Sequence, residues 1–167
     1  MEEVNQTLDY LWKKTYQGTD IDSVCIRADS DGTSGGLRAY QYRVCMRKDG
    51  IELDMRGRCS TGQKVLACIL IRLALADSFG GACGCMALDE PTTNLDRENV
   101  EALAASLVDL LAERQHQPNF QLIVITHDEE FLTRLSQSDA LEHYWRVSRD
   151  THCLLYTSDA ADERSSV

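Results

Sequence analysis

Apolar residues recur at two spacings along the 167-residue chain, and the spacing predicts where helices and strands lie. From Val4 to Tyr16 the spacing is helical with charges between, which predicts a short amphipathic helix. Because no capping residue precedes this helix, we expect it to be the end of something longer. Residues 21–27, 40–47 and 51–55 predict strands, and Asp49-Gly50 is a hairpin turn signal. The first part should therefore be a helix followed by a small antiparallel sheet.

A polar, glycine-rich segment at residues 29–36 interrupts that sheet. It lacks the Gly-Lys-Ser/Thr ending of a phosphate-binding P-loop, so a flexible hairpin connection is the better interpretation.

The second part alternates short apolar runs with helical patterns. A helix from about Gln63 to Ser78 is apolar nearly all round and should be buried in a core or interface. Ser60 is a good N-cap for it, and Gly62 permits close approach of a ligand to the backbone. The remaining pattern predicts strands at 86–88, 120–126 and 141–147 and a helix at 130–135. It also predicts a clear amphipathic helix that follows Asp96, a good N-cap, and runs up to residue 115.

The first two of these strands are expected to be buried and paired in parallel, because strand–helix–strand–helix order favours right-handed crossovers. The fold class is thus α/β, a mixed sheet with a small antiparallel part and a parallel βαβ part. Three segments follow: 1–17 as a helix end, 18–150 as the folded lobe, and 151–167, which has little periodicity, as a non-native or disordered tail.

Composition narrows the class of protein. A hydrophobic share of 43% and a charged share of 26% indicate a globular domain. No apolar run approaches membrane-spanning length, and no secretory signal begins the chain, so no membrane partner is expected. The seven cysteines include no Cys-x-x-Cys, which disfavours zinc. Cys45, Cys68, Cys83 and Cys85 are expected to be small buried hydrophobes, and a reducing compartment, cytosol or nucleus, is favoured.

The net charge of −10 bears on nucleic-acid binding. A nucleic-acid-binding domain usually carries a basic excess, so this chain is not expected to hold DNA tightly alone.

Candidate chemistry gathers where the predicted strands end. Asp89 and Glu90 close one strand, at the edge where open α/β sheets bind ligands. Such an acid suits a metal ion bridging nucleotide phosphates, and its neighbour suits activating a water. Alone, the two acids would favour a solvated strand-end pair, and a lone His127 would favour a structural role. With the start of the helix at Ser60, they are expected to meet in space and form a site.

In this order the motifs resemble the ABC-type ATPases. Residues 60–64, Ser-Thr-Gly-Gln-Lys, resemble the signature motif, and residues 86–90 resemble the Walker B strand. Residues 91–96 resemble the D-loop, and His127 resembles the switch histidine. Within the class, residues 53–60 and 88–99 closely resemble the carboxy-terminal lobe of the SMC-like double-strand-break repair ATPases, over about residues 1–150.

The resemblance implies a role for each position. Asp89 would hold Mg²⁺ through water, Glu90 would orient or activate the attacking water, and His127 would contact the γ-phosphate of ATP. Asp96 would act in communication between paired sites. The signature residues Ser60, Thr61, Gly62, Gln63 and Lys64 would bind ATP held by the opposite head of a homodimer, with Ser60 and Gly62 at its γ-phosphate.

One family motif is absent, since no Gly-x-x-x-x-Gly-Lys-Ser/Thr occurs in the sequence. The resemblance places this Walker A motif in an amino-terminal lobe of the same protein, beyond a coiled coil. The chain is therefore expected to be half of a nuclear ATP hydrolase, inactive alone, with the amino-terminal lobe, a nuclease subunit and DNA as partners. The helix at Val4–Tyr16 would be the coil base where the nuclease docks. Arg56 and Arg58 would relay nucleotide state or contact DNA, or be ordinary solvated charges.

Two other classes of protein share part of this pattern. An ABC transporter nucleotide-binding domain is disfavoured by the helix-and-hairpin entry and by the missing Walker A motif. A non-catalytic module that only dimerises or recruits the nuclease stays open.

Overall fold

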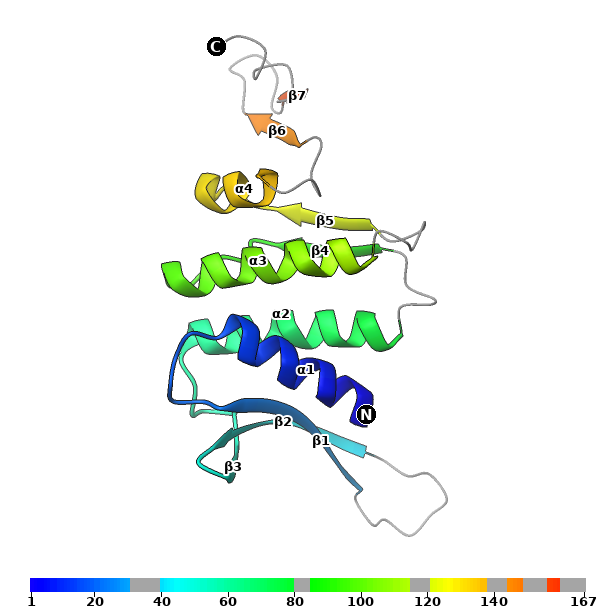
Figure 1. The fold of residues 1–167 in the computed structure, drawn as a ribbon, viewed down its shortest axis with the longest axis vertical. Helices are drawn as coiled ribbons and strands as arrows, with labels where there is room; N and C mark the ends of the chain where they lie inside the picture. The colour runs from blue at the N-terminus through cyan, green and yellow to red at the C-terminus, as the bar shows by residue number, and fades with distance from the viewer. Residues whose placement is uncertain (31–39, 80–84, 115–120, 138–143, 149–155, 160–167) are drawn as a thin grey trace.

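The computed structural model describes residues 1–30, 40–79, 85–114, 121–137, 144–148 and 156–159. Its elements follow the predicted order closely (Figure 1). They are α1 (Glu2–Thr15), β1 (Ser23–Ser30), β2 (Tyr40–Lys48), β3 (Ile51–Asp54), α2 (Thr61–Ser78), β4 (Cys85–Asp89), α3 (Arg97–Arg114), β5 (Gln121–Ile125), α4 (Glu129–Ser136), β6 (Trp145–Ser148) and β7 (Tyr156–Asp159).

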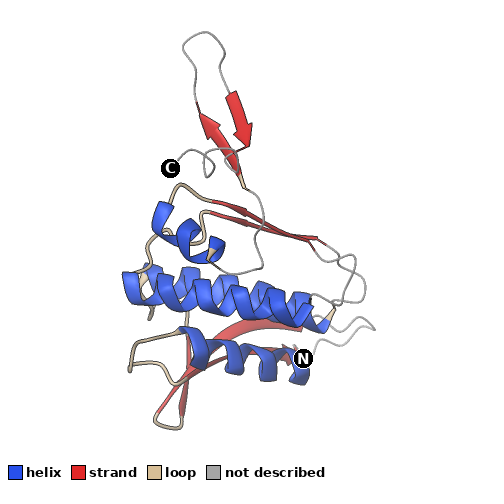
Figure 2. Ribbon diagram, turned by 45° about the horizontal axis from the view of Figure 1, so that its top comes forward, coloured by secondary structure: helices blue, strands red, loops and turns tan. Residues whose placement is uncertain are grey.

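The predicted fold class is confirmed, with its antiparallel and parallel parts in separate sheets. Strands β1, β2 and β3 form an antiparallel sheet in that order, with Cys25 opposite Cys45. Strands β4 and β5 pair in parallel, with Leu88 opposite Val124. Figure 1 shows the helices α1, α2 and α3 between the two sheets, and Figure 2 shows the parallel pair beyond α3.

Helix α1 is tied to its surroundings by polar as well as apolar contacts. Its buried face carries Leu8 and Trp12, and the Trp12 Nε1 donates to the carbonyl of Ile21 at 3.1 Å. Asn5 pairs with both backbone groups of Ile26, at 2.7 and 3.0 Å. A buried hydroxyl pair, Thr15 and Ser106 at 2.8 Å, joins α1 to α3. The helix is therefore integral to the core.

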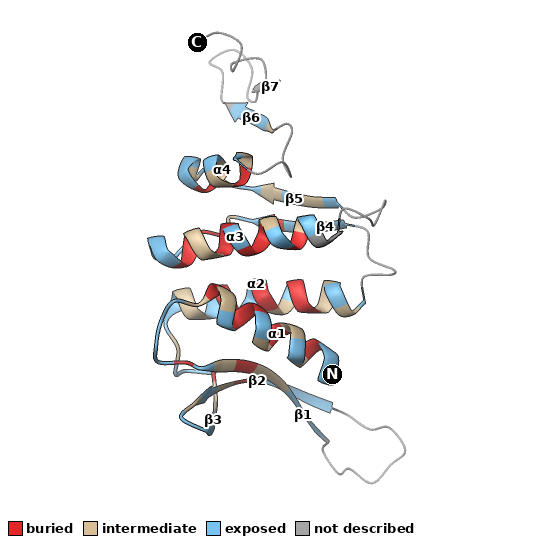
Figure 3. Ribbon diagram, in the orientation of Figure 1, coloured by how far each residue is buried: buried red, intermediate tan, exposed pale blue. Residues whose placement is uncertain are grey.

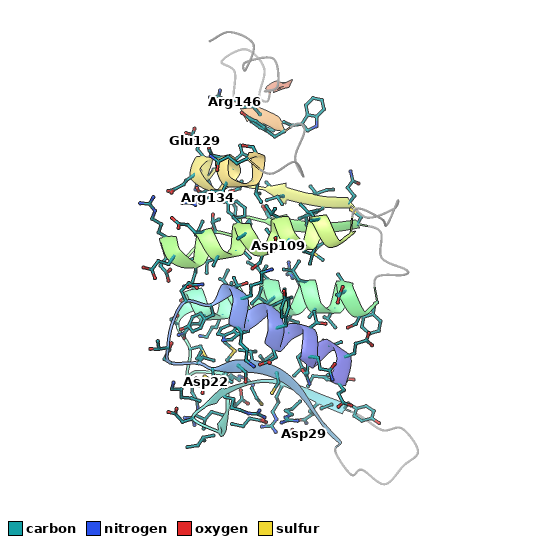
Figure 4. All side chains as sticks on the ribbon, viewed as in Figure 1. Asp22, Asp29, Asp109, Glu129, Arg134 and Arg146 are labelled. Atoms are coloured by element: carbon teal, nitrogen blue, oxygen red, sulfur yellow. The ribbon has the colours of Figure 1, made fainter. Side chains whose placement is uncertain are left out.

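The core is formed mainly by the faces that α1, α2, α3 and α4 turn inward (Figure 3). Within α2 the buried side includes Leu66, Leu70 and Leu73, whereas Lys64 and Arg72 are exposed. The prediction of a buried α2 thus holds for one side. Ion pairs at the periphery join separate elements, among them Lys14 with Asp109 at 2.5 Å and Arg134 with Glu101 at 2.6 Å (Figure 4).

The two parallel strands are less buried than predicted. Met86, Leu88, Leu122 and Val124 point to the core, and of these only Leu88 is fully buried. On the opposite face, Ile123 and Ile125 are 42% and 54% exposed. The expectation of two buried strands was therefore wrong for one face. A parallel pair normally has both faces covered.

Further differences are local. Cys45 is buried as expected, but Cys68 and Cys85 are exposed, and Cys83 lies outside the described residues. The described cysteines form no disulfide. Within the segment predicted to be a tail, Tyr156–Asp159 forms β7 and pairs antiparallel with β6. The predicted loop at 29–36 falls almost entirely outside the described residues, as do the end of the predicted helix at 115 and residues 141–143 of the last predicted strand. The predicted boundaries at residues 17 and 150 stay predictions.

None of the helices in the described part of the chain is both long and apolar enough to cross a membrane.

Candidate functional site

The first turn of α2 is organised by Ser60, which lies in extended conformation just before the helix. Its Oγ accepts from the backbone N–H of Gln63 at 3.1 Å, and Gln63 Oε1 accepts from the Ser60 backbone N–H at 2.9 Å. This reciprocal pair is a capping box. It starts the helix at Thr61, two residues before the predicted start. Because Oγ is used as an acceptor, the hydroxyl hydrogen of Ser60 is free to donate to an anion.

Gly62 lies against the loop that follows β4. A Cβ at this position would lie 2.5 Å from the carbonyl oxygen of Asn94, which real Cβ atoms do not tolerate. The predicted signature and D-loop segments are therefore in direct backbone contact. Gly62 was expected to permit a close approach by a ligand, and here the close approach is by the chain itself.

The loop from Glu90 to Asp96 reverses the chain through left-handed residues. Glu90 and Asn94 have φ of 47° and 63°, a region that few residues other than glycine adopt. Asp96 ends the turn and caps α3, accepting from the backbone N–H and the side-chain Nδ2 of Asn99 at 2.9 and 2.7 Å. These hydrogen bonds, the backbone one foremost, lower the pKa of Asp96.

The starts of α2 and α3 line one pocket of about 770 Å³. Ser60, Gly62 and Gln63 contribute from α2, and Asn94 to Asn99 from the loop and α3. The end of α1 completes the pocket, as described below. We call this group the cap cluster: Ser60, Gly62, Gln63, Asn94, Asp96 and Asn99, with Tyr16 and Asp20 from the segment that follows α1.

The second group lies where β4 and β5 end. The backbone N–H of Glu90 donates to the carbonyl of Ile125 at 2.8 Å, which extends the parallel ladder by one residue. This brings Glu90 Oε2 to 2.7 Å from Nδ1 of His127. The contact with Glu90 raises the pKa of His127, whose side chain is 84% exposed. We call Glu90 and His127 the strand-end pair.

Carboxylates at and beside the strand-end pair could bind a ligand. Oε2 of Glu90 is buried and has no hydrogen bond of good geometry to the described residues, although the His127 ring lies beside it. Asp89 is exposed at the end of β4, and its carboxylate makes no hydrogen bond or ion pair within the described part of the chain. The described residues include no group of three or more potential metal ligands. One free carboxylate fits a Mg²⁺ ion that keeps several waters and binds substrate phosphates.

The predicted site residues come together in two groups. The expectation that the start of α2, the acids and His127 form one site is therefore only partly met. Glu90 meets His127, and the signature segment meets the D-loop, but no side-chain hydrogen bond or ion pair joins the cap cluster to the strand-end pair among the described residues. Figure 1 shows the start of α2, the start of α3 and the ends of β4 and β5 on the same side of the molecule. Thr61 and Lys64 are exposed beside Ser60.

The pattern of the sequence missed three contributors to the cap cluster: Tyr16, Asp20 and Asn99. Asn99 lies three residues after the N-cap Asp96, a spacing typical of capping partners, so it could have been found. Tyr16 and Asp20 reach Gln63 across more than 40 positions in the sequence, for which no local signal exists.

Comparison with known proteins gives a consistent result. No family model matches the chain. The DNA repair protein rad50 of Schizosaccharomyces pombe is 61% identical over 153 residues, covering 91% of the chain and 12% of the relative. The DNA repair protein RAD50 of Saccharomyces cerevisiae is 56% identical over 150 residues, covering 90% and 11%. The chain thus spans roughly an eighth of these relatives or less.

Among solved structures, one from work on ATP-driven dimerisation and DNA-stimulated activation of SMC ATPases has a TM-score of 0.63 at 18% identity. The match covers 98% of the chain and 87% of that structure. At this identity the match shows the fold alone. The sequence carries the family assignment, and it confirms the predicted resemblance: the chain belongs to the Rad50 family, of which it spans one segment, and has the fold of an SMC ATPase head.

Proposed function

We propose that the chain is the carboxy-terminal lobe of a DNA double-strand-break repair ATPase, which contributes catalytic residues to Mg²⁺-dependent ATP hydrolysis. The observation that carries the proposal is the strand-end pair. A carboxylate and an imidazole lie 2.7 Å apart at the carboxyl edge of two parallel strands, where α/β sheets bind ligands. The similarity to Rad50 proteins supports the class of reaction.

In this proposal Glu90 orients and deprotonates the attacking water. Its backbone is fixed by the hydrogen bond to the Ile125 carbonyl, and its buried Oε2 is held 2.7 Å from Nδ1 of His127. A correctly positioned general base contributes on the order of 10²–10⁴ to a rate. His127, with its raised pKa, offers a donor to the terminal phosphate while its other nitrogen stays beside Glu90.

Asp89 is the candidate Mg²⁺ ligand, through water, because its carboxylate is exposed and uncommitted. When bound, Mg²⁺ would neutralise charge that develops on the transferred phosphoryl group. Ser60 and Gly62 would meet the γ-phosphate bound by the opposite head of a homodimer, with Thr61, Gln63 and Lys64 beside them. Asp96 would link the two sites. The free hydroxyl hydrogen of Ser60 at a helix start suits this task, since helix N-termini attract anions.

The amino-terminal lobe of the same protein is the proposed partner for the uncovered face of β4 and β5. Ile123 and Ile125 are apolar and exposed there, and the sequence holds no Walker A motif to bind phosphates. Association with a nuclease subunit and DNA, in the nucleus, belongs to the same proposal.

The test is Mg²⁺-dependent ATP hydrolysis by this chain with and without a separately expressed amino-terminal lobe. We expect turnover only in the mixture and a loss of about 100-fold or more in Glu90→Gln. The matched control is Glu129→Gln. Glu129 is an exposed acid at the start of α4, close in the sequence to His127 but outside the proposed site, so this variant should stay active (Figure 4).

Turnover by the chain alone would mean that it holds a phosphate cradle of its own. A mixture that associates and binds ATP without turnover would overturn the catalytic assignment in favour of a dimerising or recruiting module.

A further inference from the structure

The side-chain amide of Gln63, within the signature segment, is held by Tyr16, the C-cap residue of α1, and by Asp20 in the segment that follows α1. Its Nε2 donates to the Tyr16 hydroxyl at 2.8 Å and to Asp20 Oδ2 at 2.7 Å. The Tyr16 hydroxyl in turn donates to Asp20 Oδ1. The three side chains close a ring of hydrogen bonds, which we call the latch. Because Gln63 Oε1 accepts from the Ser60 backbone, every polar atom of the amide has a partner.

Tyr16 is not free to leave this position. Its ring stacks on the buried Trp12, with ring centroids 4.5 Å apart and planes at 29°. On its other side, a Cβ at Gly18 would collide with the Tyr16 ring and hydroxyl. Tyr16 and Gly18 line the same pocket as Ser60 and Gly62. The residues that follow α1 are thus packed against the Ser60 side of the cap cluster.

The protonation states suit a persistent latch at neutral pH. Burial, and then the Asp20 carboxylate, raise the pKa of Tyr16 to about 12. The hydrogen bond from Tyr16 lowers the pKa of Asp20. A neutral hydroxyl facing a carboxylate forms a charge-assisted hydrogen bond, which is stronger than a neutral one.

A second contact joins the same stretch to the other half of the cap cluster. The backbone N–H of Gln17 donates to Asn99 Oδ1 at 3.1 Å, and Asn99 in turn donates to Asp96. Residues 16–20 therefore touch the partners of both Ser60 and Asp96.

We propose that Tyr16 and Asp20 are positioning residues, which hold Gln63 and through it Ser60 in the geometry that receives the γ-phosphate from the opposite head. This inference rests on the proposed function and adds two residues that set its affinity for nucleotide. Because Tyr16 is stacked on the buried Trp12, the latch holds the Gln63 amide, and through it the Ser60 backbone, in place before the γ-phosphate arrives.

The test is ATP hydrolysis by the two-lobe head carrying Tyr16→Phe, which removes the hydroxyl and keeps the ring stacked on Trp12. Tyr10→Phe, on the same helix and 55% exposed, is the control. We expect the ATP concentration at half-maximal rate to rise about tenfold, the size of one lost hydrogen bond to a charged group. The rate at saturating ATP should change less than about twofold, because Glu90 and His127 are not touched. Asp20→Asn should act in the same direction.

A purely structural role gives a different result. Tyr16→Phe would then lower the stability and the maximal rate together, and leave the half-saturating concentration unchanged, which overturns the proposal. Equal behaviour of Tyr16→Phe and Tyr10→Phe overturns it as well.

An NMR measurement separates this proposal from the proposed function. With ¹⁵N in the Gln63 side chain, hydrogen exchange of its amide should be slow and become about fivefold faster in Tyr16→Phe. If the two-lobe head shows no turnover, the proposed function fails, while protected exchange still establishes the latch. Unprotected exchange in the unmodified chain overturns the latch even if the head is active.

Discussion

The cap cluster and the strand-end pair lie on the same side of the molecule, but they differ in how completely the chain satisfies them. In the cap cluster, Ser60, Gln63, Asp96 and Asn99 all have hydrogen-bond partners within the chain. In the strand-end pair, the partner of the buried Glu90 Oε2 is the largely exposed His127 ring, and the strands that carry the pair leave one face exposed. The cap cluster is therefore a network of hydrogen bonds that the chain forms by itself. The second has the features of a surface that another lobe and a ligand complete.

The exposed face of β4 and β5 gives the largest expected effect. Ile125→Lys should change the stability of the chain by no more than about 0.5 kcal/mol, because the side chain is 54% exposed. Binding to the amino-terminal lobe should weaken by about 2 kcal/mol, roughly thirtyfold in Kd, since a buried apolar anchor becomes a charge. Ile51→Lys, 62% exposed on β3, is the control. Isothermal titration calorimetry of the two lobes measures both, and equal affinities would remove the reason to call this face incomplete.

A substitution at Gly62 tests whether the cap cluster forms in the isolated chain. Gly62→Ala places a methyl group 2.5 Å from the Asn94 carbonyl, so the loop or the helix must shift. Overpacking of this kind costs about 1–3 kcal/mol. Urea unfolding of the chain alone should show this loss of stability. Thr61→Ala, at the preceding and exposed position, should change the free energy of unfolding by no more than about 0.5 kcal/mol. An unchanged stability in Gly62→Ala would mean that the two segments are not in contact.

Asp96 should show a smaller effect of the same kind. Asp96→Ala removes the N-cap of α3 and the partner of the Asn99 side chain, which costs about 1 kcal/mol. The pKa of Asp96 is lowered on folding, so its contribution is present above the unfolded value of about 3.9 and is lost as pH falls through the folded value. The difference between Asp96→Ala and the unmodified chain should therefore be measurable at pH 6 by urea unfolding and should shrink below about pH 4.

The control for this prediction is Asp9→Ala. It removes only an exposed i,i+4 pair with Lys13 and should cost about 0.5 kcal/mol or less. A cost in Asp96→Ala as small as in Asp9→Ala would contradict the capping role.

These regions also differ in how far the sequence could predict them. Helix caps are local, so Ser60 and Asp96 were found from their spacing to the apolar stripe. The meeting of Glu90 with His127 followed from a general rule, because parallel strands end at the same edge. The sequence could not show that β4 and β5 have only one covered face. A short apolar run looks the same whether the second face is covered by the chain itself or by a partner.

The latch escaped prediction for another reason. Tyr16 and Gln63 are 47 positions apart. Gln63 belongs to the predicted signature segment, but nothing in that motif indicates a partner for it, and Tyr16 has no pattern that distinguishes it from an ordinary helix residue. Their contact depends on the crossing of α1 over α2, which is a property of tertiary packing. Local sequence therefore predicted the motifs well, and the connection between motifs required the structure.

The smallest effect sharpens the comparison at the strand-end pair. Contact with Glu90 raises the pKa of His127, so in Glu90→Gln that pKa should fall toward its ordinary value near 6.5. Since the folded pKa is raised, the stabilising contact is present below the unfolded value and is lost as pH rises through the folded value. An NMR titration of the imidazole measures the shift, with Glu129→Gln as the control. An identical pKa in both variants would show that Glu90 and His127 do not interact in solution, and the strand-end pair would then need a ligand or the amino-terminal lobe to bring it together.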